Sequence, residues 1–190
     1  MAHAVHTTNA VVLSSADVQD ADKLFWLLTK DFGLVFASAR SVRREASKLR
    51  YSLQDLAPVD VSIVRGKGLW RITGAQYAGM PALSVTQQQV FGRIATLVRR
   101  VMPTDEENDM LFTIMTTTRA ALMEEESDAE AIERLAVARV LYQLGYLSCT
   151  PEYTGLIDTL TFDADALTQS TTLKDVLLLD INAGLNESQL

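Results

Sequence analysis

Phosphate binding is the chemistry that this sequence offers most plainly, through a basic stretch at residues 39–50. The stretch holds five basic side chains and one acidic one, although the whole chain of 190 residues has a formal net charge of -7. Such a cluster of cations must face solvent, and on a small β-domain it provides what contact with a phosphate backbone requires. The alternative interpretation is a solvated loop that happens to be basic.

A second basic segment, Arg65-Gly66-Lys67-Gly68, is too short for a P-loop and has the composition of a tight turn. It extends the basic surface if that turn lies on the same side as the first stretch. Together the two segments supply these candidate phosphate contacts: Arg40, Arg43, Arg44, Lys48, Arg50, Arg65 and Lys67.

Four aromatic residues offer faces on which nucleic-acid bases could stack. Trp26 and Trp70 lie in the middle of expected strands and are predicted to fill the core of the domain. Phe36 is a third candidate, and Tyr51 is better placed because it directly follows the basic stretch.

Enzyme chemistry is poorly represented. The only histidines are His3 and His6, which are expected to lie in a frayed N-terminus, and the only cysteine is Cys149, which is expected to be a structural thiol. One cysteine allows no internal disulfide and no cysteine-rich zinc site. With no acid–base pair or metal cluster apparent, the sequence predicts a protein that is not an enzyme and needs no cofactor, and it disfavours a hydrolase or nuclease.

The charge is divided unevenly along the chain. Residues 1–77 contain ten basic and seven acidic side chains, whereas residues 78–190 contain seven basic and seventeen acidic ones. This asymmetry predicts two modules, a basic one suited to a polyanion and an acidic one suited to protein partners. No long apolar run or secretory leader is evident, so we expect a cytoplasmic protein without a membrane span.

Period-two alternation predicts that the basic stretch is held between β-strands. Strands are expected to begin near Val11 and to cover residues 24–28, 34–39, 58–64 and 69–76, with Gly33 supplying a positive φ in the turn at 30–33. Five short strands, with the basic stretch linking the third and fourth, fit a small closed barrel of the OB type. An SH3-like barrel remains the alternative.

The pattern becomes helical after Gly79-Met80-Pro81. An apolar stripe runs from Val90 to Val101, and capping boxes at 104–107 and 127–130 predict two more helices, the last ending near Gly145. Short helices are expected over 163–168 and 173–181. The predicted fold is therefore α+β: an OB-fold DNA-binding barrel at 1–79, followed by an all-α domain at 80–190.

Several blocks, in order, resemble the N-terminal OB domain of RecO, the bacterial recombinational DNA-repair protein. Their order and spacing are more specific than any single block, and Leu141–Tyr146 resembles a helix ending in the same family. The N-terminal blocks are Ala10–Ser14, Asp20–Leu24, Leu28–Gly33, Ala39–Arg44 and Ser47–Arg50 with Leu53-Gln54. Two features depart from the family pattern: Ser41 replaces a usual glycine, and the cysteine-rich zinc module of many members is not expected here.

The resemblance implies a recombination mediator with no enzymatic activity. Such a protein binds single- and double-stranded DNA, promotes strand annealing, and acts with RecR and single-stranded-DNA-binding protein (SSB) to load RecA. The alternative is a protein-interaction scaffold of the same fold that has little affinity for DNA.

Overall fold

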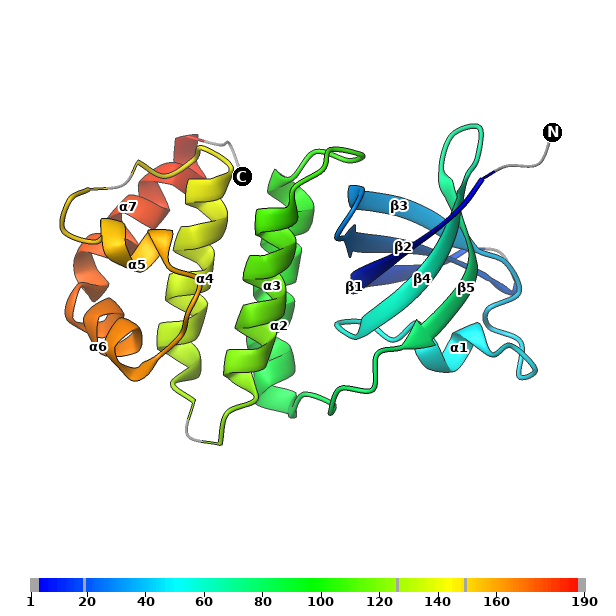
Figure 1. The fold of residues 1–190 in the computed structure, drawn as a ribbon, viewed down its shortest axis with the longest axis horizontal. Helices are drawn as coiled ribbons and strands as arrows, with labels where there is room; N and C mark the ends of the chain where they lie inside the picture. The colour runs from blue at the N-terminus through cyan, green and yellow to red at the C-terminus, as the bar shows by residue number, and fades with distance from the viewer. Residues whose placement is uncertain (1–3, 19, 126, 149, 188–190) are drawn as a thin grey trace. The chain divides into compact units, whose positions relative to one another are not determined.

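The N-terminal part of the chain folds into a closed five-stranded barrel in the computed structural model, which describes residues 4–18, 20–125, 127–148 and 150–187 (Figure 1). The strands are β1 (Val5–Val18), β2 (Asp22–Thr29), β3 (Gly33–Ala39), β4 (Pro58–Arg65) and β5 (Trp70–Tyr77). Their order around the barrel is β1-β2-β3-β5-β4, and only the β3–β5 pairing is parallel among the ladders of the described chain. This arrangement confirms the predicted OB-type barrel.

Alternation along the strands fills the barrel because every second side chain points inward. In β2, Phe25 and Leu27 are fully buried in the core, and their partners in β3, Ala37 and Val35, are fully buried there too. Between β2 and β3, Gly33 has a φ of 62°, as predicted for this turn. The other large core residues come from β4 and β5: Val59, Val61, Ile63, Trp70 and Ile72.

β1 is longer than predicted because it pairs with two strands in succession. Its first half lies against β4 and its second half against β2, with a register shift between Val12 and Ser14. His6 therefore lies in an ordered strand, with its ring 5.1 Å from that of Phe32 and 6.0 Å from that of Trp70. The expectation of a frayed end is wrong for His6, and His3 lies outside the described residues.

A segment distant in sequence completes the barrel unit. Contacts group residues up to Ala82 with Pro103–Phe112, and the remaining residues form a second compact unit. Thr104 forms a parallel bridge with Leu34, and the Asp105 N–H donates to the Leu34 carbonyl oxygen at 2.8 Å. The capping box predicted at 104–107 is therefore wrong, because these residues pair with the barrel. The helix starts later, where the Asn108 side chain accepts the Leu111 N–H.

The second unit is helical. Its elements are α2 (Val85–Val101), most of α3 (Asp109–Leu122), α4 (Ala129–Gln143), α5 (Thr154–Asp158), α6 (Ala164–Thr172) and α7 (Lys174–Glu187). Ser84 and Gln87 form a capping box at the start of α2, and the Asp128 carboxylate caps α4 in place of the predicted Ser127. The described part of the chain contains no helix long and apolar enough to cross a membrane.

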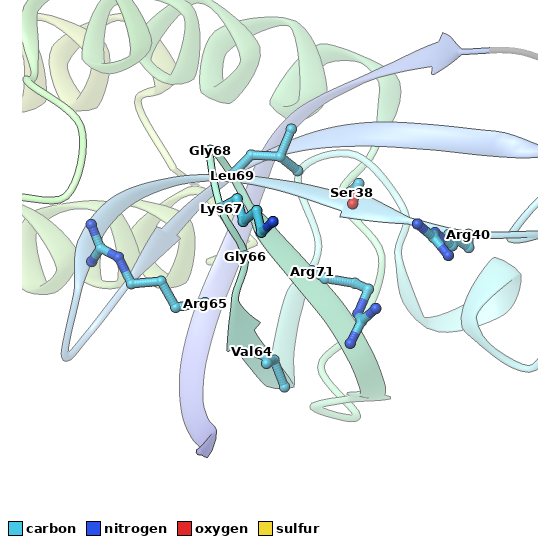
Figure 2. Close-up of a pocket in the computed structure, with 9 residues that line it drawn as sticks. All are labelled: Ser38, Arg40, Val64, Arg65, Gly66, Lys67, Gly68, Leu69 and Arg71. Atoms are coloured by element: carbon cyan, nitrogen blue, oxygen red, sulfur yellow. The ribbon is translucent and has the colours of Figure 1, made fainter. Parts of the chain in front are cut away.

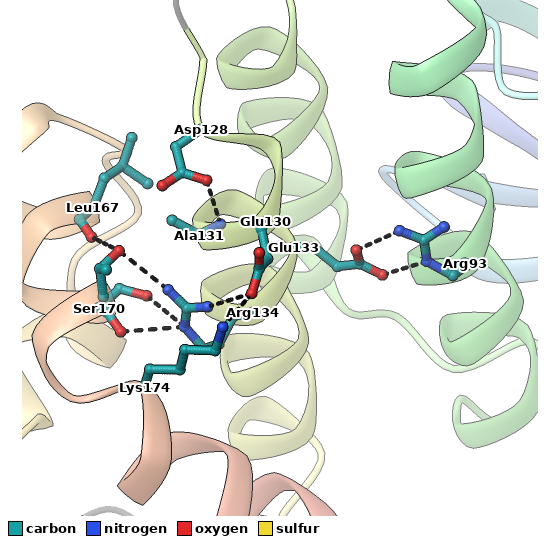
Figure 3. A network of polar contacts seen from close by, with 10 residues as sticks. Arg93, Asp128, Glu130, Ala131, Glu133, Arg134, Leu167, Ser170 and Lys174 are labelled. Carbon is teal, nitrogen blue, oxygen red and sulfur yellow. Dashed lines mark hydrogen bonds and ion pairs between the residues drawn. The ribbon is translucent and has the colours of Figure 1, made fainter.

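Helix α4 organises this unit through buried arginines. The Arg134 Nε donates to both oxygens of Ser170, and Arg93 of α2 forms a double hydrogen bond with Glu133 (Figure 3). Arg139 is 1% exposed and donates to the Leu156 carbonyl oxygen at 2.9 Å. Burial lowers the Arg139 pKa to about 10, which leaves the guanidinium charged at neutral pH. The helices α5 to α7 are therefore tied to α4 by polar contacts as well as by apolar packing.

Candidate nucleic-acid interface

The start of the basic stretch is held by the turn between β1 and β2. The Ser41 N–H donates to the Asp22 carboxylate at 2.7 Å, and the Arg43 N–H donates to the Ala21 carbonyl oxygen at 3.0 Å. Ser41 has a φ of 53°, in the left-handed region that glycine adopts without strain. The serine therefore keeps the backbone conformation that a glycine would favour, so its replacement of the usual glycine leaves this geometry in place.

The rest of the stretch is anchored by two apolar side chains. Val42 is 2% exposed and Leu53 is 5% exposed, and both belong to the barrel core. Between them the chain forms successive turns and then the short helix α1 (Leu49–Ser52). The predicted cations in this stretch are exposed, and they are Arg40, Arg43, Arg44, Lys48 and Arg50. This packing presents the cations on an ordered surface, which argues against a loose loop.

One carboxylate reduces the charge of this surface locally. Asp17 lies 3.5 Å from the Arg43 Nε and 3.5 Å from the Lys23 Nζ. All three side chains are partly exposed, so these ion pairs are weak and screened by salt. The ion pair with Asp17 therefore offsets part of the positive charge that Arg43 would present to a ligand.

A groove with a volume of about 320 Å³ lies where β3 meets the β4–β5 hairpin (Figure 2). Three predicted residues, Arg40, Arg65 and Lys67, line it together with Arg71, and no acidic residue is among the described residues of its lining. The full lining is Ser38, Arg40, Val64, Arg65, Gly66, Lys67, Gly68, Leu69 and Arg71. We call this surface the basic groove; Arg43, Arg44, Lys48 and Arg50 lie outside its lining.

Sequence reasoning missed Arg71, although its position follows from strand alternation. Trp70 and Ile72 point into the core, so the intervening Arg71 points outward. The parallel β3–β5 pairing places Arg71 opposite Ser38, two residues before Arg40. The hairpin also needs Gly66, because a Cβ there would collide with the Leu69 carbonyl oxygen.

Arg65 lines the groove, but its guanidinium contacts Asp105 and Trp70, which are not part of the lining. Its Nη2 lies 3.2 Å from the Asp105 carboxylate, and its guanidinium carbon lies 5.1 Å from the centre of the Trp70 ring. In Figure 2 the Arg65 side chain extends away from those of Arg40 and Arg71. In this structure the free cations of the groove are therefore contributed by the other three basic residues.

The stacking candidates have different environments. Trp70 is 4% exposed in the core, as predicted, and Tyr51 is 72% exposed. The core placement predicted for Trp26 is wrong, because Trp26 is half-buried between the inward-pointing Phe25 and Leu27 and so faces outward. Its ring stacks on that of Phe36, with centroids 4.4 Å apart. Of the four predicted candidates, Tyr51 and this outward-facing pair therefore have faces that a base could reach.

Within the described ranges, no group of three His, Cys, Asp or Glu side chains is placed so that it could hold a metal ion. Cys149, which is predicted to be a structural thiol, lies outside the described residues.

The closed barrel and its strand order define an OB-fold domain. Domains of this class bind oligonucleotides and oligosaccharides with the face of their second and third strands and with the loops that join β1 to β2 and β4 to β5. Residues 1–80 match the family model described as "Recombination protein O N terminal". The barrel of this chain is therefore similar to the N-terminal domain of RecO DNA repair proteins.

Two bacterial proteins that are similar to this chain are both described as DNA repair protein RecO. A DNA repair protein RecO of Dehalococcoides mccartyi strain BAV1 is 41% identical over 69 residues, which cover 36% of this chain and 27% of that protein. A DNA repair protein RecO of Clostridium perfringens is 24% identical over 142 residues, which cover 73% of this chain and 58% of that protein. The matched region thus spans between about a quarter and three fifths of the length of these relatives.

Proposed function

We propose that this protein is a recombination mediator that holds single- and double-stranded DNA by its phosphates on the barrel. The observation that carries the proposal is the basic groove, in which Arg40, Lys67 and Arg71 converge although the chain as a whole is acidic. Arg44, Lys48 and Arg50 extend this surface along the ordered basic stretch.

The chemistry of the groove favours contact with phosphate over reading of sequence. Arginine and lysine neutralise phosphates of any sequence, and each contact releases counterions from the nucleic acid. If about four phosphates are neutralised, the affinity for single strands should fall with salt at a logarithmic slope of about -3. A mediator needs this kind of binding, because it must act wherever DNA is damaged.

Similarity to RecO proteins supports a role in recombinational repair. The curated relatives are DNA repair proteins, and recombinational repair follows from the family description. We propose that this chain promotes strand annealing and acts with RecR and SSB to load RecA, without catalysis of its own. Residues 83–102 and 113–190, which form the helical unit, contain seven basic and thirteen acidic side chains, and this acidic balance suits protein partners better than DNA.

Reversal of two groove charges tests the proposal. In the double variant Lys67→Glu/Arg71→Glu, the affinity for a fluorescent oligonucleotide should fall at least about tenfold, and the salt slope should lose about 1.4 as two phosphate contacts disappear. Lys30→Glu is a control for charge reversal away from the groove, with half the change in net charge, because Lys30 is exposed in the turn at the opposite end of β3 from Arg40. Equal affinities for all three proteins would contradict the proposed site.

The scaffold hypothesis predicts a different result. A scaffold would be captured by RecR and SSB but would leave the oligonucleotide unbound even at low salt. Binding to both DNA and the two proteins, with strand annealing that the groove variant lacks, is the outcome expected of a mediator.

A further inference from the structure

Asp105 is a carboxylate of the chain itself that pairs with Arg65, one of the cations proposed to bind DNA. Its Oδ2 accepts a hydrogen bond from the Arg65 Nη2 at 3.2 Å, and its Oδ1 accepts one from the Trp70 Nε1 at 2.7 Å. A carboxylate and a phosphate group bind arginine with the same donor geometry. Asp105 therefore stands where a phosphate oxygen would stand if Arg65 bound DNA.

The two partners of this ion pair are held very differently. Asp105 is fixed by the buried Trp70 ring, by its N–H bond to Leu34, and by the adjacent bridge at Thr104. It also keeps a left-handed φ of 59°, a conformation that non-glycine residues adopt only when surrounding contacts enforce it. Arg65 is 65% exposed, so its guanidinium can leave the carboxylate without disturbing the core.

The pair is weak enough for DNA to break. Exposed ion pairs shift an equilibrium by about fivefold or less. A DNA strand in the basic groove brings phosphates close to Lys67 and Arg71, which share the groove lining with Arg65. Several neighbouring phosphates then compete with one carboxylate for the same guanidinium.

We propose that Asp105 is an internal competitor for DNA phosphate, so that Arg65 joins the site only when a strand already occupies the basic groove. This inference rests on the proposed DNA binding. The competition lowers the affinity for isolated phosphates and small anions, which cannot displace Asp105, relative to the affinity for a strand. Because such coupling is reciprocal, DNA binding also weakens the tie between Arg65 and the 103–112 segment.

The test is the substitution Asp105→Asn, measured by oligonucleotide titration of the full chain. The asparagine oxygen can still accept the Trp70 N–H, but the side chain no longer carries the charge that holds Arg65. We expect the dissociation constant to fall two- to fivefold. Glu106→Gln is the matched control, because it removes an equal charge from the next exposed residue, and it should change the constant by much less.

A double-mutant cycle identifies the route of the effect. The gain from Asp105→Asn should disappear in an Arg65→Gln background if Asp105 acts through Arg65. An equal gain in both backgrounds, or in Glu106→Gln, would show a general charge effect and overturn the proposal. Weaker binding by a folded Asp105→Asn variant would overturn it as well, because Asp105 would then be orienting Arg65 for DNA.

The outcome also separates this inference from the proposed function. If the unaltered protein binds DNA and Asp105→Asn has no effect, only the competition is refuted. If the unaltered protein leaves DNA unbound at low salt, the proposed function and this inference both fail. The thermal unfolding midpoint of each variant should be compared first, so that a loss of fold is recognised as such.

Discussion

The left-handed backbone at Ser41 gives a prediction whose sign can be worked out in advance. Its N–H bond to Asp22 involves the backbone, so Ser41→Gly and Ser41→Ala both retain it. Alanine in a left-handed conformation costs about 1–2 kcal/mol, whereas glycine there costs only its additional chain entropy of about 0.5–1 kcal/mol. The glycine variant should therefore be more stable than the alanine variant by about 0.5–1 kcal/mol.

Urea unfolding followed by tryptophan fluorescence measures this difference. Both tryptophans lie in the barrel strands, so the signal reports on the unit that contains Ser41. Ser47 serves as the control, because its φ is not positive, and there the alanine variant should be the more stable one. If alanine and glycine rank in the same order at both positions, the backbone conformation assigned to Ser41 is refuted.

Three further predictions concern the hairpin, the basic stretch and the helical unit. Gly66→Ala should destabilise the barrel by about 1–3 kcal/mol in urea titrations and weaken DNA binding, because its Cβ would meet the Leu69 carbonyl, whereas Gly68→Ala, with open space around it, should leave the stability unchanged. Reversing Arg43 and Arg44 to Glu should weaken oligonucleotide binding in low-salt anisotropy titrations without unfolding the protein; unchanged affinity in this variant would show that the stretch is not part of the site. The N-cap bond from Ala166 lowers the pKa of Asp163, so its contribution to stability is present above the usual value near 3.8 and is lost as the pH falls through the lowered one. Thermal unfolding between about pH 2 and 5 should accordingly be less sensitive to acid in Asp163→Asn, and an unchanged profile would contradict this assignment.

Local patterns were sufficient to predict the barrel strands. Alternation over residues 58–64 puts Val59, Val61 and Ile63 on one face, and all three are buried in the core. The turn at Gly33 needs only a residue that tolerates a positive φ. The position of the basic stretch between β3 and β4 follows from the two strands predicted on either side of it. Strand periodicity and turn residues are local signals, so they can be recognised without knowledge of the tertiary contacts.

Several errors arose where distant residues decide the outcome, whereas the wrong placement of Trp26 came from reading both faces of β2 as buried. Residues 104–107 have the spacing of a capping box, but Asp105 bonds to Trp70, 35 positions earlier in the chain. The basic groove depends on the parallel pairing of Ser38 with Arg71, which no local pattern announces. For this reason the sequence identified most of the cations but did not show which of them share a surface, or that one is held by a carboxylate.

The return of the chain to the barrel at Pro103–Phe112 bears on whether the barrel can be treated as a transferable module. A fragment ending at Ala82 would contain every strand, yet the Trp70 indole would lack its acceptor and the edge at Leu34 its bridge to Thr104. A truncation or a chimera that cuts the chain at this point would therefore remove contacts that β3 and β5 make with Thr104 and Asp105. Because Pro103–Phe112 follows α2 in the sequence, a continuous fragment that keeps this support for the barrel must also contain α2.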